Sequence, residues 1–173
     1  MSQDEIKTKL RIRSSEDLSL QMDGLLALAK VLNKQLDQWY LSGGTLLGAH
    51  RDGDFIPWDW DVEVTVLTEE AQPKKGVLLK GLLQAGFAIS SNDPSHNNFK
   101  IVASGWGTEY EILGRYLKDD GKVRARPMTE VPARFFETHE VVRFRGQSFP
   151  APSPVGDFLH ALYGDWRTPL KTI

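Results

Sequence analysis

The sequence contains no cysteine. Disulfide bonds, thiolate zinc sites and cysteine nucleophiles are therefore excluded, and the expected location is the cytoplasm. It also lacks a run of about 18 apolar residues, so no transmembrane segment is expected. Residues 1–9 are polar and charged, unlike a signal peptide. Peripheral association with the inner face of a membrane stays open.

The sequence also has no large excess of acidic or of basic residues. The chain has 21 basic and 23 acidic residues and a net charge of −2. Nothing favours non-specific binding to nucleic acid, and no nucleic-acid partner is expected. Hydrophobic residues make up 40% and charged residues 25% of the 173 positions, which is typical of a globular protein. We expect a flexible N-terminus over residues 1–13 and a single domain over residues 14–173.

The clearest periodicity predicts a long helix. Ser14 followed by Asp17 is typical of a helix N-cap, and apolar residues recur from Leu18 to Trp39 at steps of three and four. A short coiled coil would show the same spacing, but additional apolar residues such as Leu28 widen the stripe. A helix packed on the domain core is the preferred interpretation.

Downstream, apolar alternation and turn residues predict further elements. Helices are expected over residues 45–50, 73–86 and 153–163. Strands are expected over residues 40–44, which end in a glycine turn, and over 59–67, 99–103 and 109–117, with a hairpin over 141–149. Residues 90–98 and 118–134 are interpreted as loops.

The most informative segment is the expected strand at 59–67. Side chains alternate between the two faces of a strand, so Asp59, Asp61 and Glu63 share one face. Neighbouring carboxylates then lie about 7 Å apart and repel each other by about 2 kcal/mol at an effective dielectric constant of 20. A divalent cation between them would remove this cost, and carboxylate oxygens suit Mg²⁺ or Mn²⁺.

Two other interpretations compete with a metal site. A solvated edge strand could carry the same charges, because water reduces the repulsion to roughly a few tenths of a kcal/mol. From this segment alone, it is as well supported as metal binding. A calcium loop of EF-hand type needs glycine at its sixth position, where this segment has Val64, so that site is excluded.

The glycine pair Gly43–Gly44 precedes this strand. Glycines let the backbone approach a phosphate closely and direct its N–H groups toward it. A glycine pair, a short helix and a strand with alternating carboxylates together resemble the core of polymerase-beta type nucleotidyltransferases. In that core the glycine turn holds the donor phosphates, and the carboxylates hold the metal that bridges them.

A longer stretch resembles the LicD family, the broader group that includes fukutin and fukutin-related protein. The resemblance rests on residues 41–51, LSGGTLLGAHR, and residues 55–63, FIPWDWDVE. The family has a Gly-Gly-Thr-Leu-Leu-Gly run, an arginine, and Ile-Pro-Trp leading into an alternating acidic strand. Glu109–Leu113 resembles its later aspartate strand, and residues 144–152 and 158–166 resemble its closing hairpin and Tyr-Gly helix end.

The resemblance implies an α+β nucleotidyltransferase (polymerase-beta-like) fold, with a mixed sheet flanked by helices. It also implies transfer of a phospho-alcohol, either phosphocholine-like or a polyol phosphate, from a CDP-linked donor. The acceptor would be a hydroxyl of a glycan or lipid-linked saccharide, and CMP would leave. The implied cofactor is Mg²⁺ or Mn²⁺.

Site residues carry over position by position. The catalytic carboxylates are expected to be Asp59, Asp61, Glu63 and Glu111, of which the last three would bind the metal. The donor phosphates would contact Gly43, Gly44, Thr45 and Arg51. The candidate donor pocket contains Tyr163 and Trp166 by the same resemblance, together with Lys100 and Arg115 unless these are ordinary surface charges.

Three features depart from the family pattern. Positions 63 and 111 hold glutamate where aspartate is usual, which keeps the charge and shifts the metal by about one methylene. Gly114 replaces a proline that is common after the third acidic strand. The chain is also short between the acidic strand and Glu111. The alternative functions are nucleotidyl transfer from an NTP, and an inactive relative that binds a nucleotide or sugar.

Overall fold

The computed structural model describes residues 12–169. Its helices are α2 (Ser15–Gln35), α3 (Gly43–Arg51), α4 (Thr68–Ala71), α5 (Lys75–Ala85) and α6 (Val155–Tyr163), with 3-10 turns η1 (Gln72–Lys74), η2 (His96–Asn98) and η3 (Ala133–Phe136). Its strands are β1 (Trp39–Leu41), β2 (Asp61–Leu67), β3 (Ala88–Asp93), β4 (Lys100–Gly105), β5 (Thr108–Lys118), β6 (Val123–Arg126), β7 (Thr129–Pro132), β8 (His139–Phe144) and β9 (Gln147–Pro152).

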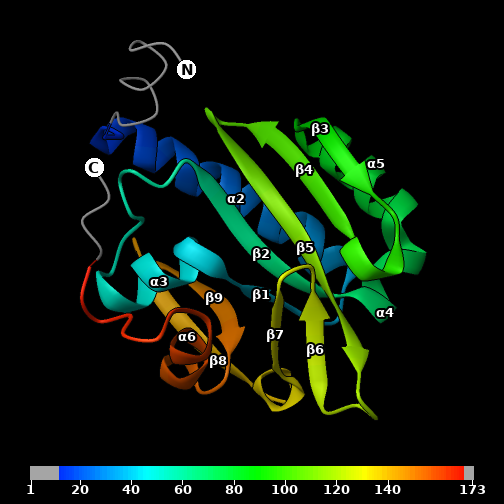
Figure 1. Cartoon of the computed structure of the whole chain (residues 1–173). Helices are drawn as coiled ribbons and strands as arrows, with labels where there is room; N and C mark the ends of the chain where they lie inside the picture. Colours follow the sequence, from blue (N-terminus) through cyan, green and yellow to red (C-terminus); the bar gives the residue numbers. More distant parts are fainter. Residues whose placement is uncertain (1–11, 170–173) are drawn as a thin grey trace, which may run out of the picture.

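The main sheet has seven strands and is mixed. Its order is β1-β2-β5-β4-β3, with β6 added to β5 and β7 added to β6. Strands β2 and β5 run parallel, whereas the other neighbours are antiparallel. A separate hairpin, β8–β9, packs beside β1. The mixed sheet and its helices confirm the predicted fold class (Figure 1).

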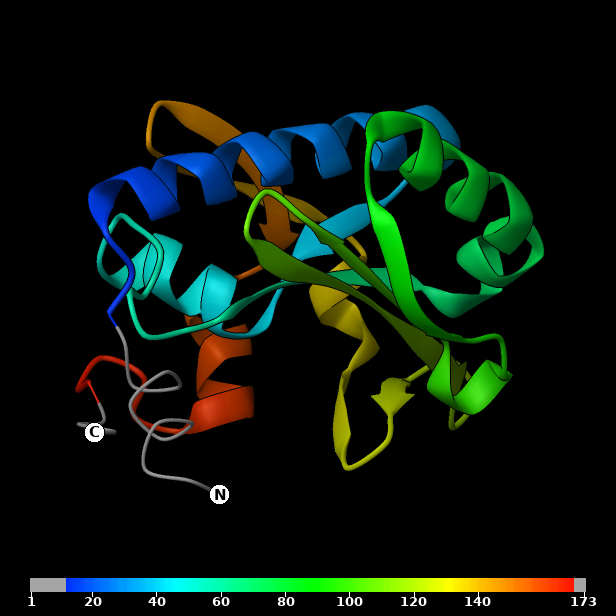
Figure 2. The same ribbon diagram turned by 90° about the horizontal axis from the view of Figure 1, so that it is seen from above.

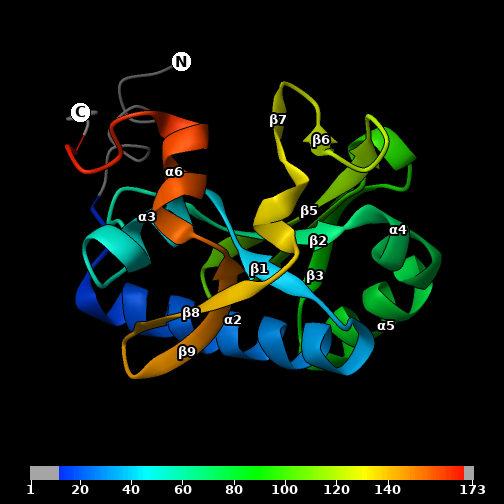
Figure 3. The same cartoon turned by 90° about the horizontal axis from the view of Figure 1, so that it is seen from below.

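The helices divide between the two sides of the sheet. Figure 2 shows α2 and α5 side by side over one face. Figure 3, seen from below, shows α6 and the β6–β7 segment on the other side of the sheet from α2 and α5. The acidic side chains of β2 lie on the opposite face of that strand from its buried valines.

Helix α2 has the predicted beginning and packing. The Ser14 hydroxyl accepts a hydrogen bond from the Asp17 amide, and the Asp17 carboxylate accepts one from the Ser14 amide. Its apolar stripe is buried in the common core, with Leu25, Leu28 and Leu32 fully inaccessible to solvent. The helix therefore packs on the domain core, as the wide stripe predicted.

The predicted flexible N-terminus falls mostly on residues 1–11, which lie outside the described residues. Arg13 is described, and it is only 7% exposed. Its guanidinium donates to the Trp60 carbonyl at 3.0 Å and to the Thr108 hydroxyl at 2.9 Å, and it lies 4.6 Å from the centre of the Trp60 ring. Arg13 thus fixes the chain that leads into β2.

Two segments interpreted as loops contain strands instead. Residues 90–98 overlap the edge strand β3, whose mostly exposed polar residues carry no apolar alternation. Residues 118–134 contain β6, β7 and the first half of η3. These predictions were wrong because short strands such as β3, β6 and β7 are held by backbone hydrogen bonds to their neighbours, which need no long buried side-chain pattern.

Across residues 12–169, helix length and hydropathy together yield no candidate for a membrane-spanning helix.

Candidate functional site

Strand β2 turns its acidic residues to one face and its valines to the other. Val62, Val64 and Val66 are fully buried against the core. Asp61 and Glu63 lie on the opposite face, which we call the site face, and both are partly buried. The valine face therefore fixes the orientation of the carboxylates, because a shift by one residue would bury them in the core.

The neighbouring strand β5 adds a third carboxylate to the site face. The parallel register places Glu63 opposite Glu111, and Asp61 opposite Glu109. Glu111 lies 3.4 Å from the Lys100 ammonium, an ion pair between β5 and β4. The structure therefore brings Glu63 and Glu111 together from separate segments, and it assigns Lys100 to Glu111.

Asp59 lies in the turn before β2, two residues earlier than the strand begins. Its amide donates to the Ile56 carbonyl at 3.0 Å, which closes this turn. The predicted strand start at residue 59 was therefore wrong, because this turn occupies that position. Asp59 still lies near Glu63, since its carboxylate faces Gly44 while that of Glu63 faces the adjacent Gly43.

The crowding of carboxylates changes their acidity. Burial, the hydrogen bond to Asp61 and the charges of Asp61 and Glu63 raise the pKa of Asp59 to about 7. Burial raises the pKa of Glu63 to about 7 as well, with the charges of Glu111 and Asp61 adding to the rise while Arg126 and Arg115 oppose it. Negative charge on this face is therefore costly without a cation.

The glycine pair packs directly against these carboxylates. A Cβ atom on Gly43 would lie 1.5 Å from Glu63 Oε2, and one on Gly44 would lie 2.0 Å from Asp59 Oδ2. Gly43 also has a φ of +57°, which favours glycine. Helix α3 begins at Gly43, so its first turn, with free N–H groups, borders the site face.

Thr45 holds α3 to β2. Its hydroxyl accepts a hydrogen bond from the Glu63 amide at 2.9 Å, and the residue is 2% exposed. The Ser42 amide donates to the Glu63 carbonyl at 3.1 Å. In this structure Thr45 therefore positions the carboxylate strand, and its predicted contact with a donor phosphate stays a prediction.

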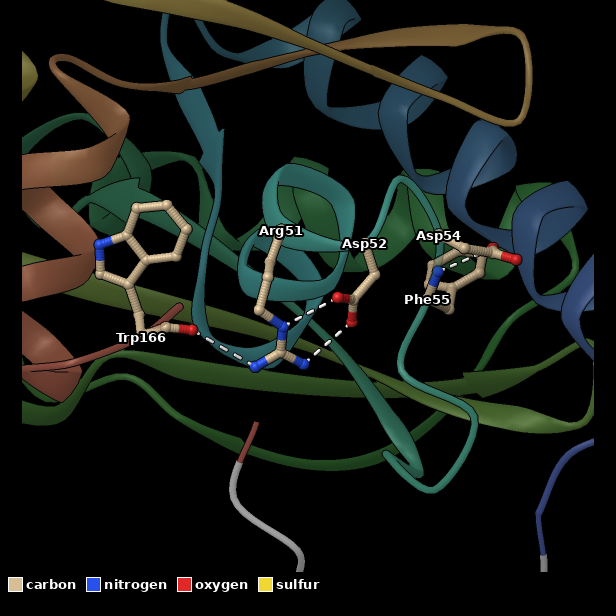
Figure 4. Close-up of polar contacts among 5 residues, drawn as sticks. All are labelled: Arg51, Asp52, Asp54, Phe55 and Trp166. Atoms are coloured by element: carbon tan, nitrogen blue, oxygen red, sulfur yellow. Dashed lines mark hydrogen bonds and ion pairs between the residues drawn. The ribbon is translucent and has the colours of Figure 1, made fainter. Parts of the chain in front are cut away.

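The Arg51 guanidinium forms hydrogen bonds to two other residues of the chain. Its Nε and Nη2 donate to the two Asp52 carboxylate oxygens at 2.9 Å each, and Nη1 donates to the Trp166 carbonyl at 3.4 Å (Figure 4). Figure 4 also shows the Phe55 amide on the Asp54 carboxylate, at 2.7 Å, in the following loop. Arg51 thus ties the end of α3 to the segment after α6.

A pocket of about 460 Å³ lies between α3 and the end of α6. It is lined by Leu47, Arg51, Ile56, Trp58, Tyr163, Asp165, Trp166 and Thr168. Tyr163 is 46% exposed as a whole residue, yet burial of its phenol and the charges of Glu63, Asp59 and Asp61 raise its pKa to about 12. The charge of the carboxylates therefore reaches this phenol. Tyr163 and Trp166 line the pocket, whereas Lys100 and Arg115, which were also predicted for it, do not.

The carboxylates suit a hard divalent cation in their chemistry. They offer only oxygen donors, and their raised pKa values are relieved by positive charge. As they stand, no three His, Cys, Asp or Glu side chains within residues 12–169 are gathered closely enough to hold one metal ion. Metal binding by Asp61, Glu63 and Glu111 therefore stays a prediction.

Two arginines complete the site face. Arg115 follows Glu111 by four residues on β5, and Arg126 ends the neighbouring strand β6. Their charges act on the pKa of Glu63. The sequence suggested only Arg115, because Arg126 fell in a segment interpreted as a loop. The alternation of Arg124, Ala125 and Arg126 is the one signal that favoured a strand there.

The fold resembles two solved structures of the antibiotic-resistance factor ANT(2″)-Ia. The solution structure has a TM-score of 0.58 at 14% identity, covering 79% of this chain and 66% of that chain. The crystal structure in complex with adenylyl-2″-tobramycin has a TM-score of 0.55 at 14% identity, covering 77% and 69%. The likeness concerns the fold alone, and it agrees with the predicted mixed sheet flanked by helices.

Sequence similarity extends to ribitol 5-phosphate transferase FKRP of Mus musculus and of Homo sapiens. Each is 52% identical over 33 residues, which is 19% of this chain and 7% of the relative. The chain thus matches a small fraction of the length of these relatives. Residues 37–154 match LicD/FKTN/FKRP, nucleotidyltransferase domain, a range that includes β2, the glycine pair, Glu111 and both arginines. The chain therefore belongs to the LicD/FKTN/FKRP family, and residues 37–154 correspond to its nucleotidyltransferase domain.

Proposed function

We propose that the protein transfers a phospho-alcohol from a CDP-linked donor to a hydroxyl of a glycan or lipid-linked saccharide. Family membership and the similarity to a ribitol 5-phosphate transferase support this class of reaction. The carrying observation is the site face, where Glu63 and Glu111 lie opposite each other beside the glycine pair of α3. The transferred group is phosphocholine-like or a polyol phosphate.

In the proposed reaction, the acceptor oxygen forms a bond to the phosphorus that carries the alcohol. The bond from that phosphorus to the bridging oxygen breaks, and CMP leaves with that oxygen. Asp61, Glu63 and Glu111 would hold Mg²⁺ or Mn²⁺, which would supply Lewis-acid polarisation of the phosphates. Glu111 is the third ligand or the acceptor of the hydroxyl proton.

The first turn of α3 would contribute to phosphate binding through its backbone. Its free N–H groups and the positive end of its dipole favour a negatively charged phosphate beside Gly43 and Gly44. The absence of Cβ atoms at these positions leaves space between the helix and the carboxylates. The chain therefore acts mainly by positioning the donor and neutralising its charge, which is the usual basis of phosphoryl transfer catalysis.

A second function keeps the fold and changes the bond that is broken. The protein would then transfer a nucleotidyl group from an NTP to its acceptor and release pyrophosphate. The fold similarity to ANT(2″)-Ia, solved with adenylyl-2″-tobramycin, favours this alternative. An inactive relative would bind nucleotide without release of either product.

The released product separates these functions. The whole chain is incubated with CDP-choline, CDP-ribitol, CDP-glycerol, CTP or ATP, with and without Mg²⁺ or Mn²⁺, and CMP and pyrophosphate are quantified. Metal-dependent release of CMP from a CDP-alcohol supports the proposal. Pyrophosphate from an NTP supports the alternative, and nucleotide-induced thermal stabilisation with neither product identifies a binding protein.

A further inference from the structure

A pair of arginines lies directly across two antiparallel strands. Tyr116 of β5 is opposite Ala125 of β6, so Arg115 and Arg126 occupy the next position on each strand. Residues opposite each other in an antiparallel pair share a face, and like charges in this arrangement are destabilising. The fold therefore accepts a repulsive pair at this point.

Within residues 12–169, neither guanidinium forms a side-chain hydrogen bond or an ion pair. Arg115 is 3% exposed, and its Nε and Nη1 atoms are buried without a hydrogen bond, as is Nη1 of Arg126. No described residue forms an ion pair with either side chain. Burial and the nearby charge of Arg126 lower the pKa of Arg115 to about 10. Buried N–H groups of a cation that lack an acceptor are strongly unfavourable.

Arg124 shows what a structural arginine looks like on the same strand. Its guanidinium pairs with Glu69 and donates to the Arg115 carbonyl at 3.2 Å. Arg124 lies two positions before Arg126, so the two residues share a face of β6. One short strand therefore carries a guanidinium with hydrogen-bond partners, that of Arg124, and one with a buried N–H group that lacks a partner, that of Arg126. Arg124 is thus a matched reference for Arg126.

The unpartnered pair borders the carboxylate site. Arg115 follows Glu111 by four positions on β5, so the two share a face about 13 Å apart along the strand. The charges of Glu63 and Glu111 act on the pKa of Arg126, as does burial, which lowers it most. The guanidiniums are close enough to feel these carboxylates, yet they form no ion pair with them. The guanidinium N–H groups that lack an acceptor therefore remain available to an anionic ligand.

We propose that Arg115 and Arg126 form a binding site for a phosphoryl group, and that the natural occupant is the diphosphate of the nucleotide-linked donor. Guanidinium groups bind phosphate oxygens through paired, charge-assisted hydrogen bonds, which would satisfy the buried N–H groups. The phosphoryl site stands on the arginine geometry alone, whereas the choice of a donor diphosphate rests on the proposed function.

The test measures binding of inorganic pyrophosphate, CDP, glycerol 3-phosphate and cytidine to the whole chain in EDTA. Arg126→Gln is compared with Arg126→Lys and with the reference variant Arg124→Gln. Arg126→Gln should weaken the binding of pyrophosphate and of CDP at least about tenfold. Arg126→Lys should lose less affinity, because lysine keeps the charge but lacks the planar guanidinium. Cytidine binding should not change, and Arg124→Gln should bind pyrophosphate as wild type does.

Thermal stability separates this role from a structural one. Because Arg126 has no partner without ligand, Arg126→Gln should melt at the wild-type temperature or higher. Loss of folding, or unchanged pyrophosphate affinity in Arg126→Gln, would overturn the inference, as would no detectable pyrophosphate binding by wild type. Tighter binding of glycerol 3-phosphate than of CDP would assign the pair to a phosphorylated acceptor and overturn the donor assignment.

The result is independent of turnover. If no CDP-alcohol is consumed but Arg126→Gln loses pyrophosphate affinity, the phosphoryl site stands and the proposed function fails. If CMP is released by wild type and Arg126→Gln binds pyrophosphate normally, the proposed function stands and the arginine assignment fails.

Discussion

One end of the site face carries a cluster of carboxylates, and the other end carries a pair of arginines. The fold accommodates these two groups of charges differently. At the acidic end, the carboxylates contact the glycine turn of α3, and Glu111 has Lys100 as a partner. At the basic end, Arg115 and Arg126 have no hydrogen-bonded partner among the described residues. The acidic end is thus partly compensated by protein, whereas the basic end depends on a ligand that the protein does not supply.

The largest expected effect breaks the acidic end. Asp61→Asn removes a predicted metal ligand while keeping the shape of the side chain. Loss of a residue that only hydrogen-bonds to a metal ligand typically lowers metal affinity or activity roughly 10- to 100-fold. Because Asp61 is a predicted ligand itself, we expect metal-dependent CMP release to fall at least about 100-fold. Asp120→Asn is the matched control, because Asp120 is an exposed turn residue with a positive φ that asparagine tolerates. Equal turnover in both variants would exclude Asp61 from the metal site.

The second effect separates close packing from backbone strain. Gly43→Ala places a Cβ where Glu63 Oε2 lies, at a φ of +57°. Gly53→Ala, at +69°, meets no heavy atom within 4 Å. Both carry a backbone cost of about 1–2 kcal/mol, or roughly 2–8 °C in melting temperature. Only Gly43→Ala should show a further fall in melting temperature and a loss of donor turnover. Equal melting temperatures of Gly43→Ala and Gly53→Ala would contradict the close packing at the acidic end.

A third effect concerns pH. In the folded protein the pKa of Glu63 is raised to about 7, above its ordinary value of 4.5, so the native state binds more protons than the unfolded state between these values. The stability of the metal-free protein should therefore fall as pH rises from about 5 to 8, by roughly 3 °C or more in melting temperature. Glu63→Gln should reduce this slope in melting curves recorded in EDTA. An identical slope in the variant would contradict the burial of an uncompensated charge.

The smallest effect contrasts a paired arginine with the unpaired ones. Arg51→Gln removes the ion pair with Asp52, whose side chain is 43% exposed, and the contact with the Trp166 carbonyl. We expect a loss of about 1 kcal/mol, or roughly 2–4 °C in melting temperature, with little change in pyrophosphate affinity. A loss of affinity as large as that of Arg126→Gln would instead support the predicted role of Arg51 in phosphate binding.

The sequence predicted the acidic end well because its signal is local. Alternation within one strand places Asp61 and Glu63 on one face, and the glycine pair is near them in the chain. The capped helix α2 and the hairpin β8–β9 were predicted for the same reason, since neighbouring residues determine them.

The basic end could not be predicted because it depends on strand register. Arg115 and Arg126 become neighbours only when β6 pairs with β5, and the alternation within the four residues of β6 is too short to predict that register. The contact of Arg51 with the Trp166 carbonyl and the ion pair of Glu111 with Lys100 are likewise tertiary outcomes that compete with the ligands expected for these residues. Residue types therefore predicted the kind of site, and the fold determined which charges remain available.

The most direct test of the central claim is anomalous diffraction at the manganese edge from crystals of the whole chain grown with Mn²⁺ and CDP. The account predicts one peak about 2.1 Å from oxygens of Asp61 and Glu63, with Glu111 beside it. A fully occupied CDP with no metal peak at the site face, or a peak held by other residues, would contradict it.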